Sequence, residues 1–195
     1  HLNGLLKPDR GNVFVNNIKI NKVKYDQLRS IRRDMSMVFQ FGALLDSLTI
    51  KENVALAFYS NDKYDSKEIY EKVDHSLNLV GLPGIGNLMP SEISGGMKKR
   101  VGIARAIVTN PKCILYDEPT TGLDPINTDK INQLIGKISS SKIASVFVTH
   151  EIKTVFNVAN KVVMLHDGSI IFSGSPDDLK NTQDKFIKYF ISGEK

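Results

Sequence analysis

Three short apolar runs in the second half of the chain constrain its fold more than any other feature. They occupy residues 113–116, 145–148 and 161–165, and helical patterns at 126–138 and 152–158 separate them. Continuous apolar runs of this length are typical of strands that are buried on both faces of a sheet. Parallel strands need long crossover connections, so the alternation predicts an α/β fold built on a parallel sheet.

Two antiparallel hairpins are expected in addition to these strands. Asn16-Asn17 lies between the short apolar segments of 13–20, and Asp167-Gly168 lies within 164–172. Asn, Asp and Gly tolerate the positive φ that a two-residue hairpin turn requires. The predicted fold is therefore a parallel sheet flanked by helices, with an antiparallel β hairpin portion.

Residues 42–110 are mainly helical and are expected to form a subdomain inserted into the sheet. Helices are predicted at 50–58, 66–80 and 97–108, and the second of them carries one apolar stripe at helical spacing. We expect one domain with four parts: an N-terminal core and hairpin at 1–41, the helical subdomain at 42–110, a core sheet at 111–174 and a helical tail at 175–195.

Composition and charge exclude several other classes of protein. The 195 residues include one cysteine, Cys113, which rules out a disulfide framework and a multi-cysteine zinc site. No apolar run approaches the roughly 18 residues that span a bilayer. The net charge is +5, but the dense basic clusters, 98–100 and Arg32-Arg33, have no interleaved aromatic residues. We therefore expect a solvated surface at these clusters and no nucleic-acid partner.

An acidic pair follows the first of the apolar strands. Asp117 and Glu118 come directly after 113–116, at the carboxyl end where parallel sheets bind their ligands. A carboxylate at Asp117 can hold Mg²⁺, and one at Glu118 can orient and polarise a water molecule. Taken alone, a strand that simply ends in acidic surface residues is the stronger interpretation.

A second candidate site precedes the helix at 97–108. Ser94-Gly95-Gly96 can bring backbone N–H groups close to an anion at the positive end of that helix. Ser94 is equally suited to cap the helix without any ligand. Gln40 follows a short apolar strand predicted at 36–39, and His150 lies two residues after the strand at 145–148. An amide at such a position can ligate Mg²⁺ or position water, and an imidazole can donate to a phosphate. Each of these signals is weak by itself.

In their order along the chain, these features resemble the nucleotide-binding subunit of an ATP-binding cassette (ABC) transporter. The resemblance covers essentially the whole chain. The matching motifs are Gln40 for the Q-loop, 93–97 with Ser94, Gly95 and Gly96 for the signature motif, 114–118 for the Walker B strand, Gly122-Leu123-Asp124 for the D-loop and His150 for the switch histidine.

Two stretches narrow the resemblance further. Residues 41–50 followed by Glu52-Asn53-Val54, and 95–101 with Met97 where most transporters have Gln, are similar to the Mla-type phospholipid-transport ATPases. In that family the ATPase drives lipid movement between the inner and outer membranes of Gram-negative bacteria, and plastid relatives import lipid. The resemblance thus implies phospholipid trafficking across the cell envelope.

The resemblance also implies ATP as ligand, with Mg²⁺, and a role for each residue at the strand ends. Asp117 and Gln40 would complete the shell of the metal ion. Glu118 would orient water for attack on the γ-phosphate, and His150 would stabilise the charge that develops there.

The partners implied by the resemblance are a second ATPase subunit, in a homodimer, and transmembrane permease subunits. Ser94, Gly95 and Gly96 of one subunit would cover the γ-phosphate bound to the other, and Asp124 would couple the two sites. Residues 41–58 would pass motion to the permease. The expected location is peripheral, at the cytoplasmic face of the inner membrane.

One motif of that family does not occur in the 195 residues. They contain no G-x-x-x-x-G-K-[ST] phosphate-binding loop, and the resemblance places residues 1–8 in the helix that follows such a loop. We expect a truncated form of an active ATPase that alone binds Mg-ATP weakly, hydrolyses it negligibly and leaves an apolar groove in its sheet. A naturally degenerate subunit, and a non-transport ABC ATPase of DNA repair or translation, are the alternatives.

Overall fold

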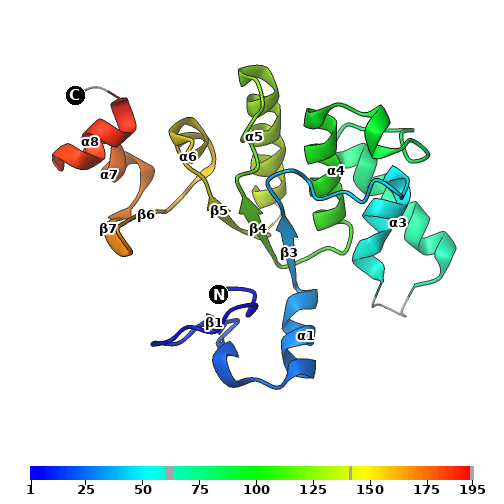
Figure 1. Ribbon diagram of the computed structural model, residues 1–195, viewed down its shortest axis with the longest axis horizontal. Helices are drawn as coiled ribbons and strands as arrows, with labels where there is room; N and C mark the ends of the chain where they lie inside the picture. The colour runs from blue at the N-terminus through cyan, green and yellow to red at the C-terminus, as the bar shows by residue number, and fades with distance from the viewer. Residues whose placement is uncertain (60–63, 141, 194–195) are drawn as a thin grey trace. The chain divides into compact units, whose positions relative to one another are not determined.

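The computed structural model describes residues 1–59, 64–140 and 142–193. These residues form two compact units. The first unit contains 1–119 and 138–148, and the second contains 120–137 and the residues from 149 onward. Figure 1 follows the elements in chain order from β1, near the N-terminus, to α8, near the C-terminus.

A three-stranded parallel sheet lies in the first unit, which confirms the predicted parallel α/β sheet. The run at 161–165 is not part of it, contrary to the prediction, because that run pairs antiparallel in a separate hairpin, and 35–38 supplies the third strand instead. The strands of the parallel sheet, in their spatial order, are β3 (Met35–Val38), β4 (Cys113–Asp117) and β5 (Ala144–Val148). Val38 pairs with Tyr116, and Asp117 pairs with Val148. Because all three strands run in one direction, their carboxyl ends meet at one edge of the sheet (Figure 1).

The predicted burial of the apolar strands on both faces is wrong for β5. The central strand β4 has a neighbour on each side and buries Ile114 and Tyr116 almost completely. Among the described strands, β5 pairs only with β4. Val146 and Val148 of β5 are 38% and 61% exposed. The apolar sequence of β5 is therefore left partly uncovered beside an open sheet edge.

The helical part of the first unit has a well-packed interior. Its elements are α2 (Ile50–Ala55), η2 (Leu56–Phe58), α3 (Ser66–Leu79), η3 (Pro90–Glu92) and α4 (Gly95–Ile107). Reciprocal capping boxes, Thr49 with Glu52 and Asp65 with Glu68, start α2 and α3. Residues of all three α-helices are fully buried against one another, among them Val54, Val73 and Val101.

The helix to which the resemblance assigns residues 1–8 is not formed, because these residues make turns and bends, and a small hairpin follows them. The elements of this N-terminal segment are β1 (Phe14–Val15), β2 (Ile18–Lys19), η1 (Ile20–Lys22) and α1 (Tyr25–Arg33). Asn16 and Asn17 have φ of 49° and 61°, which is the left-handed geometry expected for this turn. The predicted first hairpin is confirmed.

The second unit contains the other hairpin. Its elements are the first part of α5 (Pro125–Ser140), α6 (Ile152–Val158), β6 (Val162–His166), β7 (Ser169–Gly174), α7 (Pro176–Lys180) and α8 (Lys185–Ser192). β6 pairs antiparallel with β7, turning at Asp167 and Gly168 as predicted. The expected burial of 161–165 on both faces is wrong, because Val163 and Leu165 are 49% and 69% exposed.

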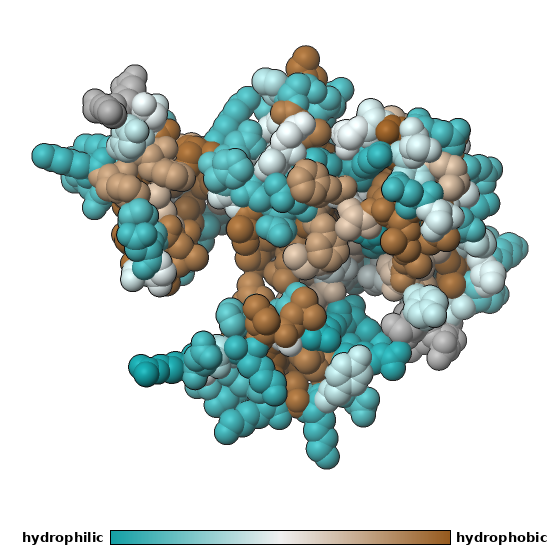
Figure 2. Space-filling view, in the orientation of Figure 1, coloured by the Kyte–Doolittle hydropathy of each residue, from teal (hydrophilic) through white to brown (hydrophobic). Residues whose placement is uncertain are grey.

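Both units leave large apolar side chains on their surfaces (Figure 2). In the first unit they include Leu5, Phe41 and Tyr59, and in the second they include Leu165 and Ile170. None of the helices in the described ranges combines the length and the apolar character that a membrane crossing requires.

Candidate functional site

The open carboxyl edge of the parallel sheet brings together Gln40, Asp117 and Glu118. Gln40 follows β3 by two residues, Asp117 is the last residue of β4, and Glu118 comes next in the chain. All three side chains are half-buried. The parallel register places these three predicted site residues at the same edge, where α/β proteins bind ligands.

Glu118 has a strained backbone at this edge. Its φ is 48°, in the left-handed region that side chains other than those of Gly, Asn and Asp rarely adopt. Its N–H donates a 2.9 Å hydrogen bond to the carbonyl oxygen of Val148, the last residue of β5. Such a conformation costs about 1–3 kcal/mol and persists where the surrounding structure enforces it, often at functional sites.

The turn Ser94-Gly95-Gly96 lies at the start of α4. The Ser94 side chain accepts a 3.3 Å hydrogen bond from the N–H of Met97, so its predicted capping role is confirmed. Ser94 and Gly95 are exposed, and a Cβ added at Gly95 would meet no atom within 4 Å. The first N–H groups of a helix of 13 residues are thus accessible to an anion.

The segment that follows Gln40 packs directly on α4. Gly42 has φ of +76°, and a Cβ there would lie 2.9 Å from the carbonyl oxygen of Lys98. The Arg105 guanidinium donates hydrogen bonds of 2.6 Å and 2.8 Å to the carbonyl oxygens of Gly42 and Ala43. Burial lowers the pKa of Arg105, although an arginine remains charged. These contacts hold the segment after Gln40 against α4.

The expectation that the basic cluster 98–100 lies on a solvated surface is wrong at its central residue. Lys99 is 7% exposed, and its ammonium donates a 3.1 Å hydrogen bond to the carbonyl oxygen of Pro119. Arg100 also donates to backbone carbonyl groups. Lys99 shares a helix face with buried Ile103, four residues later, and that spacing was the available signal. Lys99 therefore joins α4 to the loop that follows Glu118.

Asn53 organises the loop between Gln40 and α2, a role that the sequence pattern did not reveal. It is fully buried. Its amide nitrogen lies 3.0–3.1 Å from the carbonyl oxygens of Leu45, Leu48 and Thr49, and its amide oxygen accepts a 2.7 Å hydrogen bond from the N–H of Leu45. A buried amide satisfied in this way holds the loop in one conformation.

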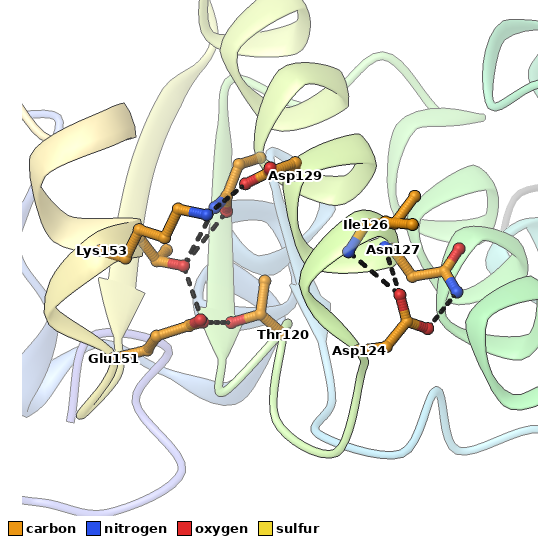
Figure 3. Close-up of polar contacts among 9 residues, drawn as sticks. Thr120, Asp124, Ile126, Asn127, Asp129, Glu151 and Lys153 are labelled. Carbon is orange, nitrogen blue, oxygen red and sulfur yellow. Dashed lines mark hydrogen bonds and ion pairs between the residues drawn. The ribbon is translucent and has the colours of Figure 1, made fainter.

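Asp124, in the second unit, caps the start of α5 (Figure 3). Its carboxylate accepts hydrogen bonds of 3.0 Å from the N–H groups of Ile126 and Asn127, and one from the Asn127 side chain. The backbone and side-chain hydrogen bonds from Asn127 hold the pKa of Asp124 below its ordinary value. The carboxylate predicted to couple two sites thus has a structural role within its own chain.

His150 belongs to the second unit and is exposed. The next residue, Glu151, accepts hydrogen bonds from Thr120 and Thr154, a network that the sequence pattern did not predict (Figure 3). The first unit brings together three predicted site residues at the sheet edge and holds the Ser94 turn on α4. Asp124 and His150 lie in the other unit.

The side chains at the sheet edge suit one type of metal ion. In the described ranges, no three His, Cys, Asp or Glu side chains gather into a metal cage. Mg²⁺ needs no such cage, because it commonly uses one or two protein oxygens together with water and phosphate oxygens. The carboxylate of Asp117 and the amide oxygen of Gln40 are hard oxygen donors of that kind.

Comparisons with solved structures identify the same fold in ABC cassettes. The dimeric post-hydrolysis structure of the ATP-binding cassette MJ0796 with ADP and Pi matches 89% of this chain and 77% of its own, at 35% identity and a TM-score of 0.79. The structure of cbiO1 from Clostridium perfringens, part of the ABC transporter complex cbiONQ, matches 98% of this chain and 76% of its own, at 28% identity and a TM-score of 0.83.

Sequence comparisons agree with the structural ones. The chloroplastic protein TRIGALACTOSYLDIACYLGLYCEROL 3 of Arabidopsis thaliana is 35% identical over 97% of this chain and 60% of its own length. The methionine import ATP-binding protein MetN of Bacillus subtilis is 38% identical over 97% of this chain and 56% of its own length. The chain thus spans little more than half the length of these relatives. The family model described as ABC transporter matches residues 1–121. The chain therefore belongs to the ABC transporter family and represents part of its ATP-binding domain.

Proposed function

We propose that the complete protein hydrolyses ATP and that Glu118 orients the attacking water. The observation that carries this proposal is the strained backbone of Glu118 at the carboxyl edge of the sheet, one residue from Asp117. A fixed carboxylate at this position can polarise water for in-line attack on a γ-phosphate. The neighbour with ADP and Pi is a cassette caught after hydrolysis, which supports this chemistry.

Asp117 and Gln40 would hold Mg²⁺ through their oxygen atoms. The ion would neutralise charge on the β- and γ-phosphates. His150, which is exposed, would donate a hydrogen bond to the γ-phosphate as charge develops there.

The remaining phosphate contacts would come from two sources outside these 195 residues. A second copy of the protein would present its Ser94-Gly95-Gly96 turn to the γ-phosphate, and the exposure of Ser94 and Gly95 supports this. Asp124 would contribute to the same interface. A phosphate-binding loop, carried on a strand of the longer protein, would pair with the open edge of β5. The exposed valines of β5 support that position.

We further propose that the complex moves phospholipid. The name of the Arabidopsis relative contains a galactolipid, which supports a lipid cargo. Other relatives of similar identity are named for methionine import and ribonucleotide transport, so the names of the relatives cover several kinds of cargo. Phe41, Leu45 and Tyr59, which are 75%, 50% and 91% exposed, offer an apolar surface to a permease subunit at the inner face of the membrane.

The test is the Glu118→Gln variant of the full-length protein. It should keep ATP binding and lower the steady-state rate of hydrolysis at least ~100-fold, because one positioned catalytic group is lost. Glu71→Gln, an exposed carboxyl change outside the segment 41–58, is the matched control and should leave the rate unchanged. Near-normal turnover by Glu118→Gln would remove Glu118 from its role. A neighbouring gene that encodes a sugar or peptide permease would contradict the phospholipid cargo and leave the proposal of ATP hydrolysis intact.

A further inference from the structure

We propose that Glu151 is a positioning residue that ties the loop after Glu118 to the segment that carries His150. The inference rests on the proposed function, because positioning matters only if His150 acts in hydrolysis. Glu151 would not touch ATP itself. Its carboxylate would fix the backbone on which His150 is presented.

The geometry consists of hydrogen bonds that converge on one oxygen atom (Figure 3). Oε2 of Glu151 accepts a 2.5 Å hydrogen bond from the Thr120 hydroxyl and a 2.8 Å hydrogen bond from the Thr154 hydroxyl. Hydrogen bonds to a charged acceptor are shorter and stronger than neutral ones. Thr120 is 2% exposed and Thr154 is fully buried, so water does not compete at these hydroxyls.

The network continues into α5. Thr154 and the buried side chain of Asn132 lie within hydrogen-bond distance, at 3.1 Å and 3.3 Å. Glu151 also donates from its N–H to the Thr149 hydroxyl at 3.1 Å. The loop at 120 and α6 therefore meet at one carboxylate, and α5 joins them through the contact between Asn132 and Thr154. All of these residues lie in the second unit.

The position of this network in the chain gives it a functional consequence. Thr120 follows Glu118 by two residues, and Glu151 follows His150 directly. A shift of about 1 Å in a catalytic group costs on the order of 100-fold in rate. A carboxylate that fixes the backbone beside both groups would influence the rate without contacting the substrate.

The structure also predicts which substitution should preserve the function. Both hydroxyls donate to the same oxygen, so the single carbonyl oxygen of a glutamine can accept both hydrogen bonds. The network therefore needs an acceptor at this point and does not need a negative charge. Alanine removes the acceptor and leaves the Thr120 hydroxyl buried without it.

The experiment compares Glu151→Ala with Glu151→Gln in the full-length protein. Glu151→Ala should lower kcat at least ~10-fold with KM for ATP changed less than about twofold, because positioning acts on the chemical step. Glu151→Gln should stay within about threefold of the wild type. Lys153→Ala, two residues later in the first turn of α6, removes an exposed ion pair with Asp129 and should change neither constant. The hydrolysis rate of each variant is divided by the concentration of sites that bind ATP, so that unfolded protein does not count as lost activity.

Two further measurements separate positioning from loss of folding. In a His150→Ala background, Glu151→Ala should cause a smaller loss than in the wild type, because the part of its effect that acts through His150 is already gone. If Glu151→Ala does not fold, Thr120→Val replaces it in the experiment. This substitution keeps the side-chain volume, removes the hydroxyl that donates to Glu151, and should also lower kcat. Equal losses in the two backgrounds, or equal rates for Glu151→Ala and Glu151→Gln, would overturn the proposal.

Amide hydrogen exchange tests the network without relying on hydrolysis. Residues 118–124 and 149–154 should exchange faster in Glu151→Ala than in the wild type, and Glu151→Gln should retain the wild-type rates. Unchanged exchange in Glu151→Ala would overturn the proposal. If the wild-type protein does not hydrolyse ATP at all, the proposed function fails, and these exchange rates still decide whether Glu151 joins the two segments.

Discussion

The neighbouring strands β4 and β5 have similar apolar sequences and very different surroundings. β4 pairs on both edges, and its Ile114 and Tyr116 are 0% and 1% exposed. β5 pairs on one edge among the described strands, and Val148 is 61% exposed. An apolar run therefore identifies a strand, while the neighbours of that strand decide how much apolar surface is buried. The same difference supports the further strand that we propose beside β5.

The largest expected effect is at the centre of β4. Ile114→Ala should lower the free energy of unfolding by about 2–5 kcal/mol, because it leaves a cavity between packed neighbours. Ile114→Val should cost only about 0.5–1.5 kcal/mol. Urea unfolding of the 195-residue chain measures both. A cost for Ile114→Ala no larger than that for Val148→Ala would break the comparison.

The effect of Val148→Ala should depend on the length of the protein. In the 195-residue chain we expect a loss below about 0.5 kcal/mol, since the side chain is largely in water. In the full-length protein, where we propose a strand beside β5, the loss should rise to about 1.5 kcal/mol, from two buried methyl groups. Urea unfolding of both proteins gives the two values. Equal losses would contradict the proposed position of that strand.

The smallest expected effect is a loss of stability at low pH, caused by protonation of the carboxylates that lie at the starts of three helices. Hydrogen bonds hold the pKa of Glu52, Asp124 and Asp178 below ordinary values of 4.5, 3.8 and 3.8, mainly those from Thr49, Asn127 and Ser175 respectively. In acid the unfolded state therefore binds more protons than the folded state. The contribution of these carboxylates to stability is complete above their ordinary pKa values and is lost as the pH falls through their pKa values in the folded state. Melting temperature should therefore decline modestly below about pH 4.5.

Two controls sharpen the acid experiment. Asp124→Asn keeps a capping side chain without a titrating group, so it should reduce the decline. The difference in stability between Ile114→Ala and Val148→Ala should not change with pH, because both substitutions are apolar. A pH-dependent difference would show that the two strands differ by more than apolar burial.

Much of the fold was predictable because its signals are local. The strands at 113–117 and 144–148, the turn at Asn16-Asn17 and the start of α4 at Ser94 all follow from periodicity and turn chemistry. The order of the candidate site residues along the chain was sufficient to identify the family. The placement of Gln40, Asp117 and Glu118 at one sheet edge followed from the parallel register.

Other features depend on partners that are distant in the sequence. Lys99 was expected in water and is buried, because the carbonyl of Pro119 lies within reach of its ammonium. Glu151 has no motif of its own, and its neighbours Thr120 and Thr154 come from different segments. Exposure of β5 and β6 was missed because strand burial depends on which elements pack beside them.

Residue types and their spacing alone determined the helices, the strands, the turns and the order of groups suited to phosphate chemistry, since each depends on backbone preferences within a few residues. Only the tertiary structure decided which strand is central, which lysine is buried and which carboxylate joins separate segments. Burial and hydrogen-bond partnership are set by atoms brought together across long stretches of chain, and local pattern does not contain that information.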